Sequence, residues 1–164
     1  MVILQLLLIS ATFLCSLVAG FLFAFSVVVF PGITQLNDKE FIRSFQFMDG
    51  VIQRNQPFFM IVWVGSILTI IALGALGSLL LDGLERNLIV LSVLVYLLGV
   101  QLPTITVNVP LNNRLQSFNV DESNDQTITK ERQDFEPRWT RWNAIRTVFA
   151  CITSLTLIVL LVEL

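Results

Sequence analysis

Four uncharged apolar runs dominate this sequence and leave few folds open to it. They contain 29, 25, 20 and 16 residues and span residues 2–30, 57–81, 88–107 and 147–162. A helix rises about 1.5 Å per residue, so about 20 residues cross the roughly 30 Å hydrocarbon core of a bilayer. Backbone polar groups find no water in that core, and a helix satisfies them internally. The runs therefore predict an all-α membrane protein, a bundle of four transmembrane helices.

The composition agrees with this class. Hydrophobic residues make up 55% of the 164 residues, charged residues 13%, and the mean hydropathy is +0.79. These values are typical of membrane proteins, and a net charge of −2 gives no indication of nucleic-acid binding. Without internal repeats, residues 1–164 are expected to form one polytopic domain with spans at about 2–30, 57–81, 88–107 and 143–162. A cleaved signal peptide is the alternative for the first run, but it has no basic start and is too long.

The basic residues predict the orientation of the spans. The connections after the first and third runs hold nine lysines and arginines, whereas the connection after the second run holds Arg86 alone. Basic residues favour the cytoplasmic side in short connections. We therefore expect both termini outside the cell membrane, with the two longer connections in the cytoplasm. The oligomeric state stays open.

Polar and aromatic residues mark the start of the fourth span. They lie at helical spacings of three, four and seven, which puts them on one face: Trp139, Trp142, Asn143 and Arg146. The uncharged run that follows has only 16 residues, so it draws Arg146 toward the bilayer core, where charges usually serve function. An aromatic belt with an arginine reaching to the interface is the other interpretation.

A polar stripe continues along the third span. Its members lie close to one helical face: Gln101, Thr104, Asn108 and Asn112, with Asn113 beside them. Pro103 and Pro110 interrupt the backbone hydrogen bonds of the same helix, and the freed carbonyls need neighbours. We interpret this segment as a kinked wall that faces the interior of the bundle.

The two longer connections also have helical patterns. Asn37 followed by Glu40 resembles a capping box, and the apolar spacing after it predicts an amphipathic helix over residues 38–54. This helix lies either on the membrane or under the mouth of the bundle, and Arg54 is either its solvated end or part of a site. Seven-residue spacing of Ile128, Phe135 and Trp142 predicts a cytoplasmic extension of the fourth span.

Missing residue types limit the chemistry. The chain has no histidine, and no carboxylate lies within the four uncharged runs, so a metal site inside the membrane lacks its usual ligands. A Gly-rich phosphate loop and a dinucleotide fingerprint are also absent. We expect no metal and no cofactor.

Three blocks of this sequence resemble a known family. They are Phe23-Ala24-Phe25 through Pro31, the run Asn108-Val109-Pro110-Leu111-Asn112-Asn113-Arg114-Leu115, and Trp139-x-x-Trp142-Asn143-x-x-Arg146. With four spans and this length, the chain resembles the anthrone-oxygenase-like membrane proteins, over nearly its whole length. The resemblance implies a four-helix bundle. For some members it also implies conversion of anthrones to anthraquinones by molecular oxygen without an added cofactor.

The residues are compatible with that implied reaction. A deprotonated anthrone can itself reduce oxygen, so the protein has to hold a flat, hydrophobic aromatic molecule and favour its anion. Under this hypothesis the catalytic residues are Arg146, Asn112 and Asn108, and the substrate-binding residues are Trp139, Trp142, Asn143, Asn113, Arg54 and Gln101. The base stays open between Asp49, a carboxylate of the second connection and water.

Two other functions remain open. The polar mouth of a non-catalytic protein in the lipid bilayer would bind lipid head groups through Arg43, Arg54 and Arg146, or bind a small hydrophobic molecule or a partner protein. Transport is the weaker alternative, because the two halves show no inverted repeat and no charged path crosses the membrane.

Overall fold

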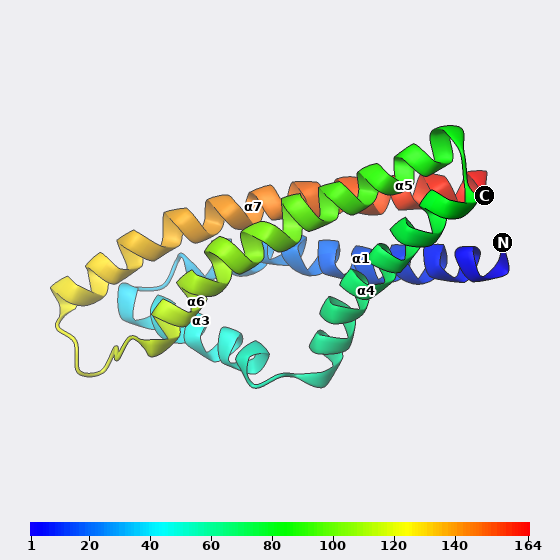
Figure 1. Cartoon of the computed structure of the whole chain (residues 1–164). Helices are drawn as coiled ribbons and strands as arrows, with labels where there is room; N and C mark the ends of the chain where they lie inside the picture. The colour runs from blue at the N-terminus through cyan, green and yellow to red at the C-terminus, as the bar shows by residue number, and fades with distance from the viewer.

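Helices make up almost the whole chain in the computed structural model, which describes residues 1–164. Four helical runs are long and apolar enough to cross a membrane: Val2–Ile33, Pro57–Leu80, Gly83–Ser117 and Asp125–Glu163. The predicted all-α fold with four spans is therefore confirmed, and the chain is a multi-pass membrane protein. Both termini lie at one end of the bundle, and α3 (Asp38–Gln53) lies at the other end, beside residues 118–124 (Figure 1).

Two of the four runs are single helices, α4 (Pro57–Leu80) and α7 (Asp125–Glu163). The first run consists of α1 (Val2–Ala24), the π-helical turn η1 (Phe25–Val29) and α2 (Phe30–Ile33). The third run consists of α5 (Gly83–Tyr96), the π-helical turns η2 (Leu97–Gln101) and η3 (Thr104–Asn108), and α6 (Val109–Ser117). The third run thus continues well past residue 107. α7 joins the short fourth span to its predicted extension without a break at Pro137.

Each π-helical turn ends two residues before a proline: Pro31, Pro103 or Pro110. The residue just before the proline donates its amide to the carbonyl five residues back: Phe30 to Phe25, Leu102 to Leu97, and Val109 to Thr104. A proline has no amide hydrogen, and its ring clashes with the carbonyl four residues back. A wider turn makes room for the ring and keeps the neighbouring carbonyls bonded. The prolines of the third span therefore change its hydrogen-bonding register without ending it.

Two apolar clusters hold the helices together. The larger cluster lies toward the termini and packs α1 against α4, α5 and α7 through residues such as Leu8, Ile70 and Leu157. Close approach of the third run to α7 depends on Gly99, where a Cβ atom would lie 2.4 Å from Cγ of Phe149. The smaller cluster lies around α3 and is rich in aromatic side chains.

The amphipathic helix predicted over residues 38–54 is α3. The side chain of Asn37 caps its first turn by accepting a hydrogen bond from the amide of Glu40 at 3.0 Å. Phe41 and Phe45 are buried in the smaller cluster, where Phe45 packs edge-on against Trp139 with ring centroids 5.5 Å apart. Of the two predicted placements, α3 therefore takes the one under the mouth of the bundle.

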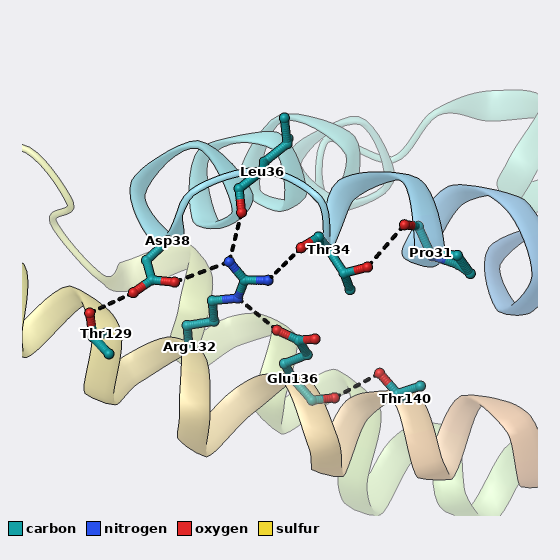
Figure 2. Close-up of polar contacts among 8 residues, drawn as sticks. All are labelled: Pro31, Thr34, Leu36, Asp38, Thr129, Arg132, Glu136 and Thr140. Atoms are coloured by element: carbon teal, nitrogen blue, oxygen red, sulfur yellow. Dashed lines mark hydrogen bonds and ion pairs between the residues drawn. The ribbon is translucent and has the colours of Figure 1, made fainter.

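A single arginine of α7 fixes the start of α3, as Figure 2 shows. Arg132 donates from Nη2 to the carbonyl of Thr34 at 2.9 Å and from Nη1 to the carbonyl of Leu36 at 2.8 Å. The same guanidinium pairs with Asp38 at 3.0 Å and with Glu136 at 2.7 Å. Carbonyls at the end of a helical run lack hydrogen-bond donors within the helix, and the guanidinium of Arg132 serves as their donor. This contact holds the first span, α3 and α7 in one arrangement.

Candidate functional site

A cavity of about 230 Å³ lies beside α3, the helix at the end of the bundle away from both termini in Figure 1. All four spans and α3 contribute to its walls. The lining residues are Phe21, Leu22 and Phe25; Phe45, Met48, Asp49 and Ile52; Phe59 and Trp63; Thr104, Asn108, Val109 and Asn112; and Trp139, Asn143 and Arg146. Ligand cavities usually measure roughly 300–1,000 Å³, so this space fits a molecule of only a few rings. Most of its surface is apolar, with a few polar groups among aromatic rings.

Arg146 is the only cation of the lining. Its guanidinium donates to Oγ1 of Thr104 and to Oδ1 of Asn143, both at 2.9 Å. Asn143 is itself held by a hydrogen bond from its Nδ2 to Oγ of Ser26 at 2.8 Å. Arg146 is 5% exposed, and no carboxylate lies within ion-pair distance of it. The charge is therefore held by neutral oxygens.

Asp49 is the only carboxylate of the lining. Nδ2 of Asn112 donates to its Oδ1 at 2.8 Å, and Nε2 of Gln53 donates to its Oδ2 at 2.7 Å. Trp139 continues this chain of hydrogen bonds by donating from Nε1 to Oδ1 of Asn112 at 2.8 Å. Asp49 is 5% exposed, and burial raises the pKa of its carboxyl more than the two amide hydrogen bonds lower it. A carboxylate with a raised pKa, next to an apolar cavity, has the properties of a base.

Three buried polar atoms near the cavity have no hydrogen-bond partner. They are Nε of Arg146, Oδ1 of Asn108 and Nε2 of Gln101. Buried polar groups are normally paired, because an unpaired one costs about 1–3 kcal/mol. Two of these atoms, on Arg146 and Asn108, belong to cavity residues, and one is a donor while the other is an acceptor. A ligand with an acceptor oxygen and a hydroxyl group would satisfy both.

Aromatic rings form much of the remaining wall. One face of Trp139 is covered by Phe30, with ring centroids 4.4 Å apart and an angle of 7° between the planes. Phe59 and Trp63 of α4 stack on each other at 5.4 Å on another wall. None of the buried residues of α4 precedes Ser66, so these two rings belong to its loosely packed half. Apolar residues such as Phe59 give no signal in a sequence where most positions are apolar.

Six of the predicted site residues lie on or next to the cavity, and three do not. Asn108, Asn112, Trp139, Asn143 and Arg146 line it, and Gln101 is one contact away, accepting a hydrogen bond from Trp63. The other three, Trp142, Asn113 and Arg54, are outside the lining.

Helical geometry explains these three positions. Trp142 is half-buried. It follows Trp139 by three residues, slightly less than one helical turn, so it lies at the edge of the face that Trp139 and Arg146 occupy. Asn113 is exposed and accepts a hydrogen bond from Gln53. Arg54 is exposed at the end of α3 and lines a separate cleft.

The model of the anthrone oxygenase family matches residues 53–156. The chain belongs to this family. Comparison of the chain with curated proteins and with solved structures finds no match. Within the anthrone oxygenase match lie α4, the whole third run and most of α7, and with them Asn108, Asn112, Trp139, Asn143 and Arg146. Asp49, one of the candidates for the base in the sequence, lies outside the matched residues, and the fold places it in the cavity wall.

Proposed function

We propose that this protein is a cofactor-independent oxygenase that converts an anthrone-like aromatic to a quinone at the cavity beside α3. One observation carries the proposal: Arg146 and Asp49 line the same apolar cavity, and neither side chain pairs with an opposite charge. A buried cation without a counter-ion favours a ligand that becomes an anion, and a buried carboxylate with a raised pKa favours proton removal.

The chemistry balances with oxygen as the only co-reactant. Asp49 takes a proton from the carbon opposite the anthrone carbonyl, and Arg146 stabilises the enolate oxygen that results. The enolate gives one electron to O₂, and the carbon radical and superoxide then combine into a peroxide, which regains the proton. Loss of the second hydrogen from that carbon, as a proton, breaks the O–O bond and releases water. The sum is anthrone plus O₂ to anthraquinone plus water.

The amides serve to orient the substrate in this scheme. Asn112 is held between Trp139 and Asp49, so it fixes the carboxylate in the wall. Oδ1 of Asn108 is free to accept a hydrogen bond from a phenolic hydroxyl, and Nε of Arg146 is free to donate to the enolate oxygen. Phe59 and Trp63 supply flat rings for the tricycle. Positioning of this kind lowers the barrier by fixing the reacting atoms before reaction.

We also propose that residues 1–164 act as one domain of the cell membrane, with both termini outside and the cavity near the cytoplasmic surface. The excess of basic residues in the connections after the first and third spans supports this orientation. Reporter fusions at each terminus test it, and a cytoplasmic signal from either terminus contradicts it.

Oxygen uptake by the purified, metal-stripped protein given an anthrone tests the reaction. We expect uptake well above the spontaneous rate, and a loss of about 10²–10³-fold in kcat for Arg146→Ala, as for removal of an oxyanion donor. Asn112→Ala is expected to lower the rate as well, because it frees the Asp49 carboxylate. The matched control is Arg141→Ala, an exposed arginine of the same helix with no hydrogen-bond or ion-pair partner. Uptake at the spontaneous rate by folded protein contradicts the oxygenase function.

A further inference from the structure

A second cleft, of about 480 Å³, lies on the other side of α3 from the cavity. Its walls come from α3, from the end of α6 and from the residues that follow α6. The side chains important here are Arg43 and Phe47 of α3, Arg54 at its C-terminal cap, and Asp121. No residue of this cleft also lines the substrate cavity. The cleft is therefore a separate site, with a polar lining.

The cleft carries an excess of positive charge. Lys39 lies at its edge and shares one carboxylate, Asp121, with Arg43. Arg54 has no carboxylate within ion-pair distance. Phe47 and Arg54 follow Arg43 by four and eleven residues, which places the three side chains on one helical face. Two arginines and one lysine against a single carboxylate suit an anion with several oxygen acceptors, such as a phosphodiester.

The position of the cleft puts it at the surface of the membrane. Pro57 begins the second span only three residues after Arg54, so Arg54 lies where the chain enters the bilayer. Phe47 is 77% exposed, and Phe58 is 76% exposed next to the start of that span. Exposed apolar side chains such as phenylalanine are buried at the boundary between lipid head groups and acyl chains. A ligand held here by its phosphate would have its apolar part beside these rings.

We propose that this cleft binds the phosphate head group of an anionic membrane phospholipid. Arg54 and Arg43 hold the phosphodiester, and Phe47 contacts the glycerol and the first carbons of the acyl chains. A free phosphate ion offers the same oxygens to the arginines, but it has no apolar part to meet Phe47. The proposal does not depend on the oxygenase reaction, because lipid binding and oxygen uptake are measured separately.

The test compares the full-length protein in nanodiscs of phosphatidylcholine with and without phosphatidylglycerol. We measure the melting temperature and, by native mass spectrometry, the phosphatidylglycerol molecules retained after release. Wild type is expected to melt higher with phosphatidylglycerol and to retain it in preference to phosphatidylcholine. Arg54→Gln is expected to weaken retention about fivefold, the factor for a loss of roughly 1 kcal/mol per basic side chain near the membrane surface. Arg54→Lys should restore part of it.

The matched control is Arg86→Gln, which removes one exposed arginine from the first turn of α5, in the connection after the second span. Equal melting temperatures of Arg54→Gln and wild type in phosphatidylcholine alone are expected, since Arg54 is exposed. Equal retention by wild type and Arg54→Gln overturns the proposal, and so does an equal loss in Arg86→Gln. Protection by inorganic phosphate as strong as that by phosphatidylglycerol overturns the choice of a lipid.

Discussion

Replacement of Asp49 by asparagine separates a catalytic carboxylate from a structural one. The side chain is 5% exposed and receives hydrogen bonds from Asn112 at 2.8 Å and from Gln53 at 2.7 Å. An asparagine side chain has the same shape and keeps one oxygen for Asn112, while the amide of Gln53 can turn to accept from the new NH₂ group. The substitution therefore removes the charge and the basicity with little change in packing.

The two expected effects of Asp49→Asn have opposite signs. Loss of a general base lowers kcat by about 10²–10⁴-fold. The free energy of unfolding is expected to rise at neutral pH. Burial raises the pKa of Asp49, so the folded state binds the proton more tightly than the unfolded state. Protonation of Asp49 therefore stabilises the fold at low pH. This stabilisation is lost as the pH rises through the pKa of Asp49 in the folded state, where the buried carboxyl ionises. The uncharged amide of the variant has no such loss.

The assay is oxygen uptake with an anthrone across a pH series, together with melting temperatures in the same detergent. Wild-type kcat should rise with pH through the raised pKa of Asp49, and Asp49→Asn should lose that rise. Asp49→Asn should melt at least as high as wild type at neutral pH. A variant that keeps kcat within about threefold refutes the role of Asp49 as base, since even a modest base contributes about 10²-fold. A variant that loses both activity and stability at every pH shows a structural carboxylate.

Two further predictions concern the packing that holds the cavity in shape. Gly99→Ala should lower the free energy of unfolding by about 1–3 kcal/mol, because the new Cβ meets the ring of Phe149 at 2.4 Å. Gly20→Ala, where no atom lies within 4 Å, is the control and should be neutral or stabilising in melting experiments. Arg132→Ala should lower the free energy of unfolding by about 3 kcal/mol, and with it the melting temperature, because the carbonyls of Thr34 and Leu36 lose their charged donor. An unchanged melting temperature, equal to that of the exposed-residue control Arg138→Ala, contradicts this.

The helices themselves were predictable because their signals are local. Uncharged runs of sufficient length predict the spans, and Asn37 with Glu40 predicts the start of α3. The prolines of the third span were visible in the sequence too, but the π-helical turns that precede them were not predicted. Pro103 and Pro110 each follow a π-helical turn that keeps the third run continuous to Ser117, beyond residue 107, where the amide of Asn108 ends the apolar run of the sequence. A membrane helix tolerates a proline when a wider turn gives the neighbouring carbonyls other amide donors.

The site was predictable only in part, because it depends on which helices meet. Asn112, Trp139 and Arg146 share a cavity as their spacing on two helices predicts. Trp142 has nearly the same spacing, but only packing decides which edge of a helical face turns toward the cavity. Asp49 lies in a connection and outside the matched family residues, and its contact with Asn112 spans 63 positions of sequence. Such a contact has no signature in a single sequence.

The proposed reaction depends on Arg146 and Asp49 lining one cavity without pairing with each other. A direct ion pair would favour the carboxylate form, lower the pKa of Asp49 and make it a weaker base. It would also neutralise the guanidinium that an enolate needs. In the fold, neutral groups occupy those positions instead: Thr104 and Asn143 accept from Arg146, and Asn112 donates to Asp49. In the proposed reaction, Arg146 thus keeps its hydrogen bonds while its interaction with a negative charge is left for the enolate, and Asp49 keeps the raised pKa that a base needs. A variant that brings a carboxylate to Arg146, such as Thr104→Asp, should therefore fold but lose oxygen uptake, because the new ion pair takes the place of the enolate; full uptake by the folded variant contradicts this.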